Sequence, residues 1–326
     1  MLRALGLGDF LTGVPALRAV ARAFPGRELV LAAPPPLAPL VRLTGVVDRL
    51  HPMPGLGELE WPAPPPEVAV NLHGSGPESH RMLLSTRPGQ LVAFDCQDAG
   101  VAGPRWSAGE HEVRRWCRLV SQTLRVTADP AELALAVPAV CAVVPDAVVI
   151  HPGAAYPARR WPPERFAAVA RWARRSGHQV MVTGSASERL LAEQVQRLAG
   201  LPDGAVLAGR TDLAELAATV AAARLVVCGD TGMAHLATAY RRPSVVLFGP
   251  TPPSAWGPPS DGPHEVVWHG TDIGDPWGDT VDPALAQVTV AEVLDRAEAL
   301  LARTPPAEPA ASSVPTPVSG AARHPG

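Results

Sequence analysis

Apolar and polar residues follow two different periods along the first 95 residues. Short runs of strand type alternate with runs of helical spacing, in the order MLRAL, VPALRAVARAFP, ELVLAA, LAPLVRLT, VDRLHPM, EVAVNLH and QLVAF. Alternation of strands and helices over about 30 residues is typical of a parallel sheet with crossover helices. The first run begins at Met1, inside the expected strand, which leaves open a start upstream of Met1.

The same order of patterns occurs a second time between residues 147 and 251. It consists of AVVIHPG, PERFAAVARWARRSG, HQVMVTGS, ERLLAEQVQRLAG, AVLAGR, LAELAATVAAA, RLVVCGD, GMAHLATAY and PSVVLFGPT. A helical pattern over 111–124 and an Ala- and Pro-rich stretch over 125–146 separate the two series. We therefore predict an α/β protein with two Rossmann-like domains, residues 1–135 and 136–303.

The C-terminal segments depart from this alternation. Residues 289–303, TVAEVLDRAEALLAR, predict an amphipathic helix with Thr289 at its N-cap. Residues 304–326 consist mainly of Pro, Ala and Ser without periodicity. Because such a segment buries too little apolar surface to order itself, we expect a disordered tail.

Length, charge and cysteine content narrow the class of protein. The 326 residues suit two domains of about 150 residues each. With 28 basic and 31 acidic residues the net charge is −3, which argues against a nucleic-acid partner. We find no apolar run of about 20 residues and no signal peptide, so we expect an intracellular protein. The four cysteines have neither Cys-x-x-Cys spacing nor matching histidines, and we predict no metal and no other cofactor.

The most informative stretch is RLVVCGDTGMAHLATAY, residues 224–240. An apolar strand stops at Gly229, and a helix is expected to start near Thr231. Such a junction directs free amides and the positive end of the helix dipole beyond the strand, where a diphosphate fits. Asp230 or Thr231 would cap the helix, Gly232 would let a ligand approach the backbone, and His235 would lie one turn along. The alternative is an ordinary capped helix.

A second stretch, HPGAAYPARRWPPERF at 151–166, follows a strand of the same half. Arg159 and Arg160 precede a helix whose first turn contains prolines. In one cleft with the first stretch, the two guanidinium groups would neutralise a doubly charged leaving group. Taken alone, such a pair is also typical of solvated surface. The chain has no lysine, so arginine must supply any such cation.

A third stretch, LGLGDFLTGVPALRAV, lies near the N-terminus. The Gly6-x-Gly8 turn lacks the third glycine of a dinucleotide-binding loop, which argues against a dehydrogenase. We expect this turn to present Asp9 as a general base opposite the anion site. The alternative role for Asp9 is N-cap of a helix beginning near Leu11.

Weaker signals complete the candidate site. Glu188, in VTGSASERL, suits either a ribose hydroxyl or helix capping. His73, in NLHGSG, ends a strand of the first half and is a candidate acceptor contact or part of a simple turn. With Gly8 and Thr12, it makes up the expected acceptor side.

The three stretches resemble the ADP-heptose lipopolysaccharide heptosyltransferases, inverting glycosyltransferases of family 9 with the GT-B fold. The resemblance implies two Rossmann-like domains whose parallel sheets face a central cleft. It also implies that Asp9 is the catalytic base and that Asp230, Thr231, Gly232 and His235 hold the diphosphate and sugar of the donor. Such relatives usually have lysine before the Trp-Pro pair, where this chain has Arg159 and Arg160, and residues 257–282 lack the cysteine-bearing segment of many relatives.

Together, the residues and the resemblance predict metal-independent transfer of a sugar from a nucleotide diphosphate to a hydroxyl of a glycan or glycolipid. An enzyme of this kind would work in the cytoplasm, at most in peripheral contact with the inner face of the cytoplasmic membrane. Two alternatives stay open. A sugar-nucleotide epimerase shares the double-Rossmann architecture, and a non-catalytic sugar-nucleotide-binding protein would need no base at position 9.

Overall fold

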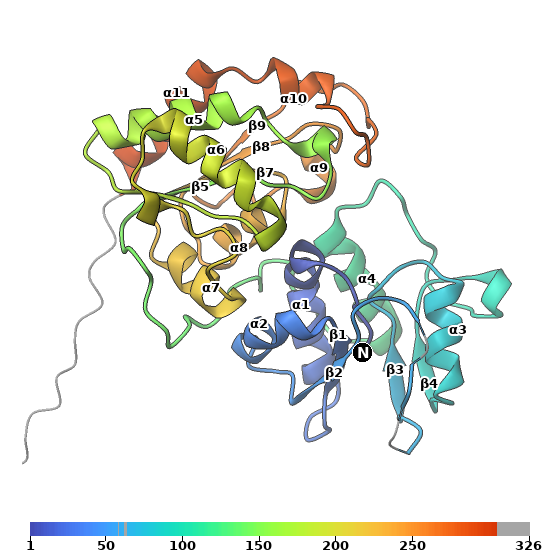
Figure 1. Cartoon of the computed structure of the whole chain (residues 1–326). Helices are drawn as coiled ribbons and strands as arrows, with labels where there is room; N and C mark the ends of the chain where they lie inside the picture. Colours follow the sequence, from blue (N-terminus) through green and yellow to red (C-terminus); the bar gives the residue numbers. More distant parts are fainter. Residues whose placement is uncertain (58, 62–63, 305–326) are drawn as a thin grey trace, which may run out of the picture.

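A computed structural model describes residues 1–57, 59–61 and 64–304 (Figure 1). The expected disordered tail therefore lies outside the described residues, apart from Thr304. The N-terminal half contains α1 (Leu7–Ala23), β1 (Val30–Ala33), α2 (Ala38–Leu43), β2 (Arg49–Pro52), β3 (Val68–Val70), α3 (Glu78–Ser85), β4 (Gln90–Val92) and α4 (Glu112–Leu124). The C-terminal half contains β5 (Val148–His151), α5 (Pro163–Arg175), β6 (Val180–Val182), α6 (Arg189–Ala199), α7 (Leu213–Ala221), β7 (Leu225–Gly229), α8 (Gly232–Ala239), β8 (Ser244–Leu247), α9 (Pro253–Trp256), β9 (His264–Val267), α10 (Pro283–Gln287) and α11 (Val290–Arg303).

The C-terminal sheet is parallel, in the order β6-β5-β7-β8-β9. Its central strands are apolar on both faces, and successive side chains enter different cores. In β5, Val148 and Ile150 pack with α5, α6 and α11, whereas Val149 packs with α7 and α8. The run of branched apolar residues is therefore explained by helices on both faces.

The N-terminal sheet is held together by Leu2. Strands β1 and β2 pair in parallel, as do β3 and β4, and Leu2 bridges Ala32 of the first pair to Asn71 of the second. The expected strand over MLRAL is thus reduced to a single bridging residue. Gly6, in extended conformation, is the N-cap of α1, so this helix begins at Leu7 and not near Leu11.

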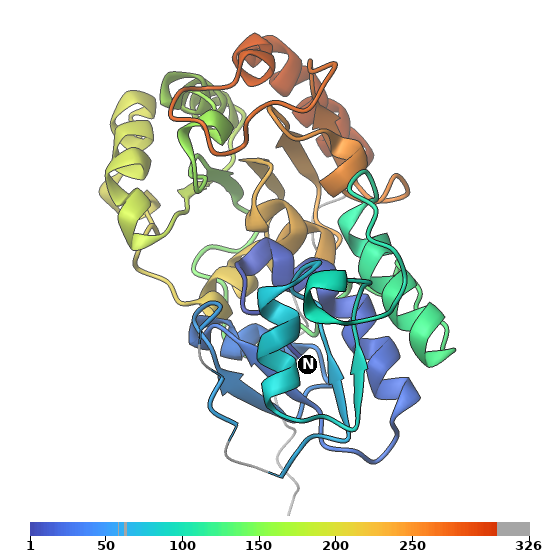
Figure 2. The same ribbon diagram turned by 90° about the vertical axis from the view of Figure 1, so that its right-hand side faces the viewer.

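The two halves share one hydrophobic core along part of their junction. A cluster of buried residues runs from α1, α2 and α4 into α7 and α8, and the contacts between α1 and α8 are extensive. Figure 2 shows the start of α1 beside α8 in a view turned by 90° from Figure 1. This packing fixes the N-termini of the two helices against each other.

Most of the elements expected from the sequence are present. The helix over 111–124 is α4, with His111 as its N-cap, and Thr289 caps α11 in a capping box with Glu292. The expected strand over AVLAGR is reduced to a bridge between Val182 and Val206. The elements α3, α9, β9 and α10 were not predicted. The boundary between residues 135 and 136 stays a prediction.

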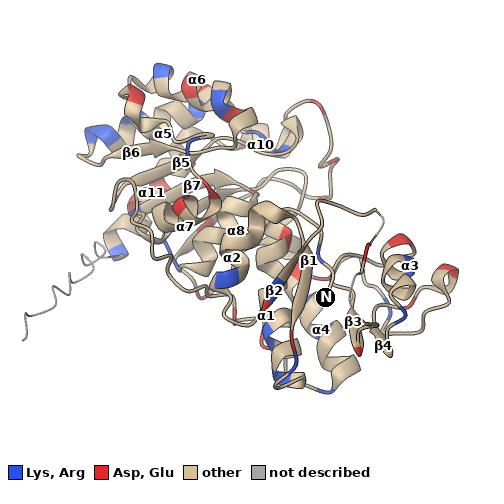
Figure 3. Ribbon diagram, turned by 60° about the horizontal axis from the view of Figure 1, so that its bottom comes forward, with Lys and Arg blue, Asp and Glu red and all other residues tan. Residues whose placement is uncertain are grey.

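Charged residues are spread over both halves, and α8 carries none (Figure 3). Within the described residues, no helix combines the length and apolar character that a membrane-spanning segment needs.

Candidate functional site

Two glycines allow the N-termini of α1 and α8 to cross at close range. A Cβ added at Gly232 would lie 2.8 Å from Cβ and Cγ of Leu7, and one added at Gly8 would lie 3.0 Å from Cδ2 of His235. The absence of a Cβ is needed most at Gly232, whereas at Gly8 the His235 ring would have to shift slightly. We expected a ligand beside Gly232, but in the structure Leu7 occupies this space.

Asp9 lies in the first turn of α1, three residues after the N-cap Gly6. It is therefore not the N-cap, the alternative that the sequence left open. Its carboxyl group is half-buried, and burial raises its pKa. The Arg3 guanidinium opposes this rise and the Glu112 carboxylate adds to it. A carboxyl group in this environment suits a general base near neutral pH.

A buried hydrogen-bond network supports the turn that carries Asp9. Arg3, which is 0% exposed, donates to the carbonyl oxygens of Asp9 and Leu72 and, at 3.0 Å, to Thr12 Oγ1. The Thr12 hydroxyl donates in turn to the Asp9 carbonyl at 2.9 Å. Thr12 is only 1% exposed, so it supports Asp9 from inside the domain and does not face solvent.

Asp230 follows β7 and pairs with Arg159. The Arg159 guanidinium donates to the Asp230 carbonyl and lies 3.3 Å from Oδ2 of the same residue. Burial raises the pKa of Asp230 from 3.8 to about 6, Arg159 opposes the rise, and the charge of Asp9 adds to it. Asp9 and Asp230, from different halves of the chain, therefore lie close enough to interact electrostatically.

Helix α8 begins beside this pair. Thr231 is its N-cap, and its hydroxyl accepts from the Met233 amide at 3.3 Å. Within residues 1–57, 59–61 and 64–304, the Thr231 and Gly232 amides donate no hydrogen bond. The Nε of Arg159 is also buried without a partner there. Free amides at a helix N-terminus beside a cation are the groups that a binding site for an anion requires.

Arg160 and Glu188 form no hydrogen bond with the Arg159–Asp230 pair within the described residues. The Nε of Arg160 donates to the Ala154 carbonyl at 2.9 Å, so the two neighbouring arginines point to different partners. Glu188 accepts from the Ser185 amide at 2.7 Å and from its hydroxyl at 2.8 Å, which is the capping role left open above. Burial alone would raise the pKa of Glu188, but the Ser185 hydrogen bonds hold it below its usual value.

His73 follows the end of β3 on the acceptor side. Its amide donates to Asn71 Oδ1 at 2.9 Å, and its Nδ1 is buried without a partner among the described residues. Asn71 is itself fixed by Ser79 and His80. Burial and, to a smaller extent, the charge of Arg3 lower the pKa of His73 to about 4, so the imidazole is neutral at pH 7.

His235 faces a cavity of about 850 Å³ between the two halves. Its ring packs against Gly8 and, with centroids 5.9 Å apart, against Trp256. Burial lowers the pKa of His235 to about 3, so it too is neutral at pH 7. The cavity is also lined by Leu11 of α1 and by His111, the N-cap of α4, so together with His235 both halves contribute to it.

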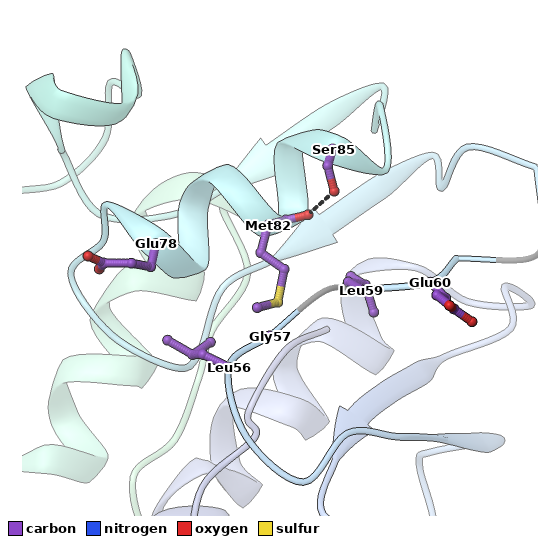
Figure 4. A pocket seen from close by; sticks show the side chains of 7 residues that line it. All are labelled: Leu56, Gly57, Leu59, Glu60, Glu78, Met82 and Ser85. Atoms are coloured by element: carbon purple, nitrogen blue, oxygen red, sulfur yellow. Dashed lines mark hydrogen bonds between the residues drawn. The ribbon is translucent and has the colours of Figure 1, made fainter.

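A second cavity, of about 650 Å³, contains none of the expected site residues. Figure 4 shows Leu56 and Met82 on facing sides of it, with Glu78 at one end. The loop after β2 and helix α3 supply its walls. Elsewhere in the described ranges, no three His, Cys, Asp or Glu side chains gather as a metal site would require.

Comparison with known proteins assigns the chain to a family. A family model described as glycosyltransferase family 9 (heptosyltransferase) matches residues 104–271, slightly more than half of the chain. The chain belongs to glycosyltransferase family 9. The matched residues include Arg159, Asp230 and α8, whereas Asp9 and α1 lie before them.

Relatives with curated names are similar over part of this family 9 chain. Lipooligosaccharide heptosyltransferase 2 of Haemophilus influenzae is 36% identical over 116 residues, which make up 34% of this chain and 33% of that protein. Lipopolysaccharide heptosyltransferase 2 of Escherichia coli is 31% identical over 159 residues, 46% of this chain and 45% of that protein. The alignments thus span between a third and a half of these relatives.

Solved structures extend the likeness to the whole fold. The E. coli ADP-heptose lps heptosyltransferase II superimposes with a TM-score of 0.73 at 21% identity, over 92% of this chain and 97% of that one. A family 9 glycosyl transferase from Veillonella parvula superimposes with a TM-score of 0.74 at 18% identity, over 93% of this chain and 96% of that one. The predicted GT-B fold is confirmed.

Proposed function

We propose that this family 9 chain is an inverting glycosyltransferase. It transfers heptose or a similar sugar from a nucleotide diphosphate, with ADP as the favoured nucleotide, to a hydroxyl of a glycan or glycolipid. The observation that carries this proposal is the junction of α1 and α8, where Asp9 of one domain lies close to the Arg159–Asp230 pair of the other. The names of the relatives support heptose as the sugar.

The donor diphosphate would bind at the start of α8. The Thr231 amide and the unpartnered Nε of Arg159 supply donors there, and the helix dipole adds positive potential. His235, neutral at pH 7, would donate one further hydrogen bond. Gly232 contributes by letting α1 approach. The end of β5 lies beside Glu188, which we assign to the ribose, with Arg160 nearby as a second cation.

The acceptor would approach from the N-terminal domain, past Gly8 and His73. Asp9 would take the proton of the acceptor hydroxyl as its oxygen attacks the anomeric carbon. The bond from that carbon to the diphosphate breaks on the opposite face, which inverts the configuration. Thr12 would act indirectly, by holding the Asp9 carbonyl.

Charge on the leaving nucleoside diphosphate would be stabilised by Arg159 and the α8 N-terminus. Preorganised donors of this kind can replace a divalent cation. We therefore propose a reaction without metal, in the cytoplasm or at the inner face of the cytoplasmic membrane, with peripheral contact at most.

A ligand panel tests the donor part of the proposal. Because a ligand that binds only the native state raises the melting temperature, ADP-heptose and other nucleotide sugars are compared by thermal shift, with and without EDTA. We expect ADP-linked sugars to stabilise the wild type and to lose most of this effect in Arg159→Met. Arg174→Met, which removes an exposed contact to the Gly200 carbonyl, serves as control. Equal stabilisation of both variants, or stabilisation by no nucleotide sugar, contradicts the proposed donor site.

A transfer assay separates the three functions considered. Release of nucleoside diphosphate that depends on an acceptor indicates a transferase. Conversion of the donor without acceptor indicates an epimerase, and binding without any conversion indicates a binding protein. Membership in family 9 favours the first outcome.

A further inference from the structure

Arg3 is a fully buried arginine for which the reaction described above has no role. It follows Leu2, the residue that joins the two pairs of strands in the N-terminal sheet. A charged side chain inside a core is costly unless hydrogen bonds and an opposite charge compensate it. Arg3 has both, and two of its partners belong to the segments that carry Asp9 and His73.

The hydrogen bonds of Arg3 join two segments that meet at the candidate site. Its Nε donates to the carbonyl of Asp9 in α1, and a terminal nitrogen donates to the carbonyl of Leu72, the residue before His73. A Cβ at Gly13 would lie 2.9 Å from Cδ of Arg3, so α1 has a glycine where the arginine stem passes. One side chain thus ties the turn with the proposed base to the strand end with the acceptor-side histidine.

Glu112, at the start of α4, supplies the opposite charge. Its Oε1 lies 3.2 Å from a terminal nitrogen of Arg3 and accepts from Trp116 Nε1 at 2.7 Å. Its Oε2 accepts from Arg115. The Arg3 guanidinium carbon lies 4.8 Å from the centroid of the Trp116 ring. Hydrogen bonds, the ion pair and the tryptophan ring together fix the orientation of the guanidinium.

We propose that Arg3 is a positioning residue for proton abstraction: it holds the Asp9 turn against the end of β3 and, balanced by Glu112, sets the charge environment of the Asp9 carboxylate. This inference rests on the proposed function, because it assumes that Asp9 acts as the base. Arg3 acts through the Asp9 turn and not by contact with the substrates.

Four charged groups face Asp9. Arg3 and Glu112 belong to the N-terminal domain, whereas Arg159 and Asp230 belong to the C-terminal domain. Arg3 and Arg159 favour the ionised form of Asp9, and Glu112 and Asp230 disfavour it. Removing Arg3 should therefore raise the pKa of Asp9, and removing the charge of Glu112 should lower it. If Arg3 and Glu112 only stabilised the fold, their removal would not shift the pKa of Asp9 in opposite directions.

The variants Arg3→Met and Glu112→Gln test this in the full-length chain. Arg165→Met is the matched control, because Arg165 also binds backbone carbonyls, those of Ala286 and Val288, and lies over a tryptophan, but far from α1 in the fold. The titration of the Asp9 carboxyl carbon is followed by NMR on protein with labelled aspartate, with Asp9→Asn providing the assignment. In parallel, the acid limb of kcat/KM is measured with ADP-heptose as donor.

We expect the Asp9 midpoint and the acid limb to move to higher pH in Arg3→Met, to lower pH in Glu112→Gln, and to stay in place in Arg165→Met. Arg3→Lys keeps the charge but loses the fork of hydrogen bonds. In this variant kcat should fall by about tenfold or more, since misplacement of a reacting group by about 1 Å can cost 100-fold, while KM for the donor stays within about twofold.

Unchanged Asp9 midpoints in both charge variants, or a wild-type kcat in Arg3→Lys, overturn the proposal. If Arg3→Met does not fold, Glu112→Gln still tests the effect on the charge environment of Asp9, and Arg3→Lys still tests the positioning of the Asp9 turn. The NMR titration does not require turnover. If the midpoints move as expected but the wild type transfers no sugar, the proposed transferase function fails, and with it the catalytic part of the role of Arg3.

Discussion

The crossing of α1 and α8 makes a sharp prediction about Gly232. An added methyl group would lie 2.8–2.9 Å from three carbon atoms of Leu7. Carbon atoms in protein cores pack at about 3.5–4.0 Å, so the overlap is about 1 Å. We expect Gly232→Ala to lower the free energy of unfolding, and we expect Leu7→Ala to relieve this effect.

The magnitude follows from two opposing terms. Overpacking of a well-filled contact typically costs about 1–3 kcal/mol. In a helix interior alanine is better than glycine by about 0.5–1 kcal/mol, and at Gly232, the first residue of α8, at most part of this gain offsets that cost. A net loss of about 1–2 kcal/mol is therefore expected for Gly232→Ala. Leu7 is half-buried, so Leu7→Ala should cost less than the 2–5 kcal/mol typical of a buried leucine.

A double-mutant cycle in urea, followed by tryptophan fluorescence, measures the coupling. We expect the double variant to be about as stable as Leu7→Ala alone, with a coupling energy of 1 kcal/mol or more. Gly204→Ala is the control, because a Cβ at Gly204 meets no atom within 4 Å. Additivity of Gly232→Ala and Leu7→Ala within about 0.5 kcal/mol would refute the crossing as the reason for the glycine.

Two further predictions concern the donor side. Asp230→Asn should raise the free energy of unfolding at pH 7.5 by up to about 3 kcal/mol, because the folded carboxyl has its pKa raised from 3.8 to about 6. The wild type should therefore lose stability relative to this variant as pH rises from about 4 to about 6. A difference in free energy of unfolding, measured in urea, that stays constant over this pH range would contradict the prediction. Glu188→Gln should lower the free energy of unfolding by about 1 kcal/mol, because it weakens the capping box with Ser185. If calorimetry finds the donor Kd unchanged in this variant, Glu188 caps the helix and does not bind the ribose.

The strands of the C-terminal domain were predictable because both of their faces are buried. Val148 and Val149 point into different cores, so an unbroken apolar run was the correct signal. The strand β9 was missed because its half-buried residues stand among prolines and polar residues. At the N-terminus, the glycines at positions 6 and 8 suggested a turn, yet Gly6 is the N-cap of α1 and Gly8 lies inside the helix, where it packs closely against His235 of α8.

Pairings across the chain could not be predicted from spacing. Arg3 stood in an apolar run, which was a signal of a buried charge, but its partner Glu112 is 109 positions away. Leu7, which fills the space beside Gly232, was missed for the same reason. Neighbouring Arg159 and Arg160 looked equivalent in sequence, and only the fold shows that Arg159 alone reaches Asp230.

The most direct test of the account compares Asp9→Asn with the wild type in the presence of ADP-heptose and an acceptor glycan. Sugar transfer is followed by ADP release and by NMR of the new anomeric linkage, and donor binding by calorimetry. We predict an inverted linkage for the wild type and a loss of transfer of about 100-fold or more in the variant, with donor Kd changed by less than about threefold. Transfer at the wild-type rate by Asp9→Asn, or a retained anomeric configuration, would contradict the account.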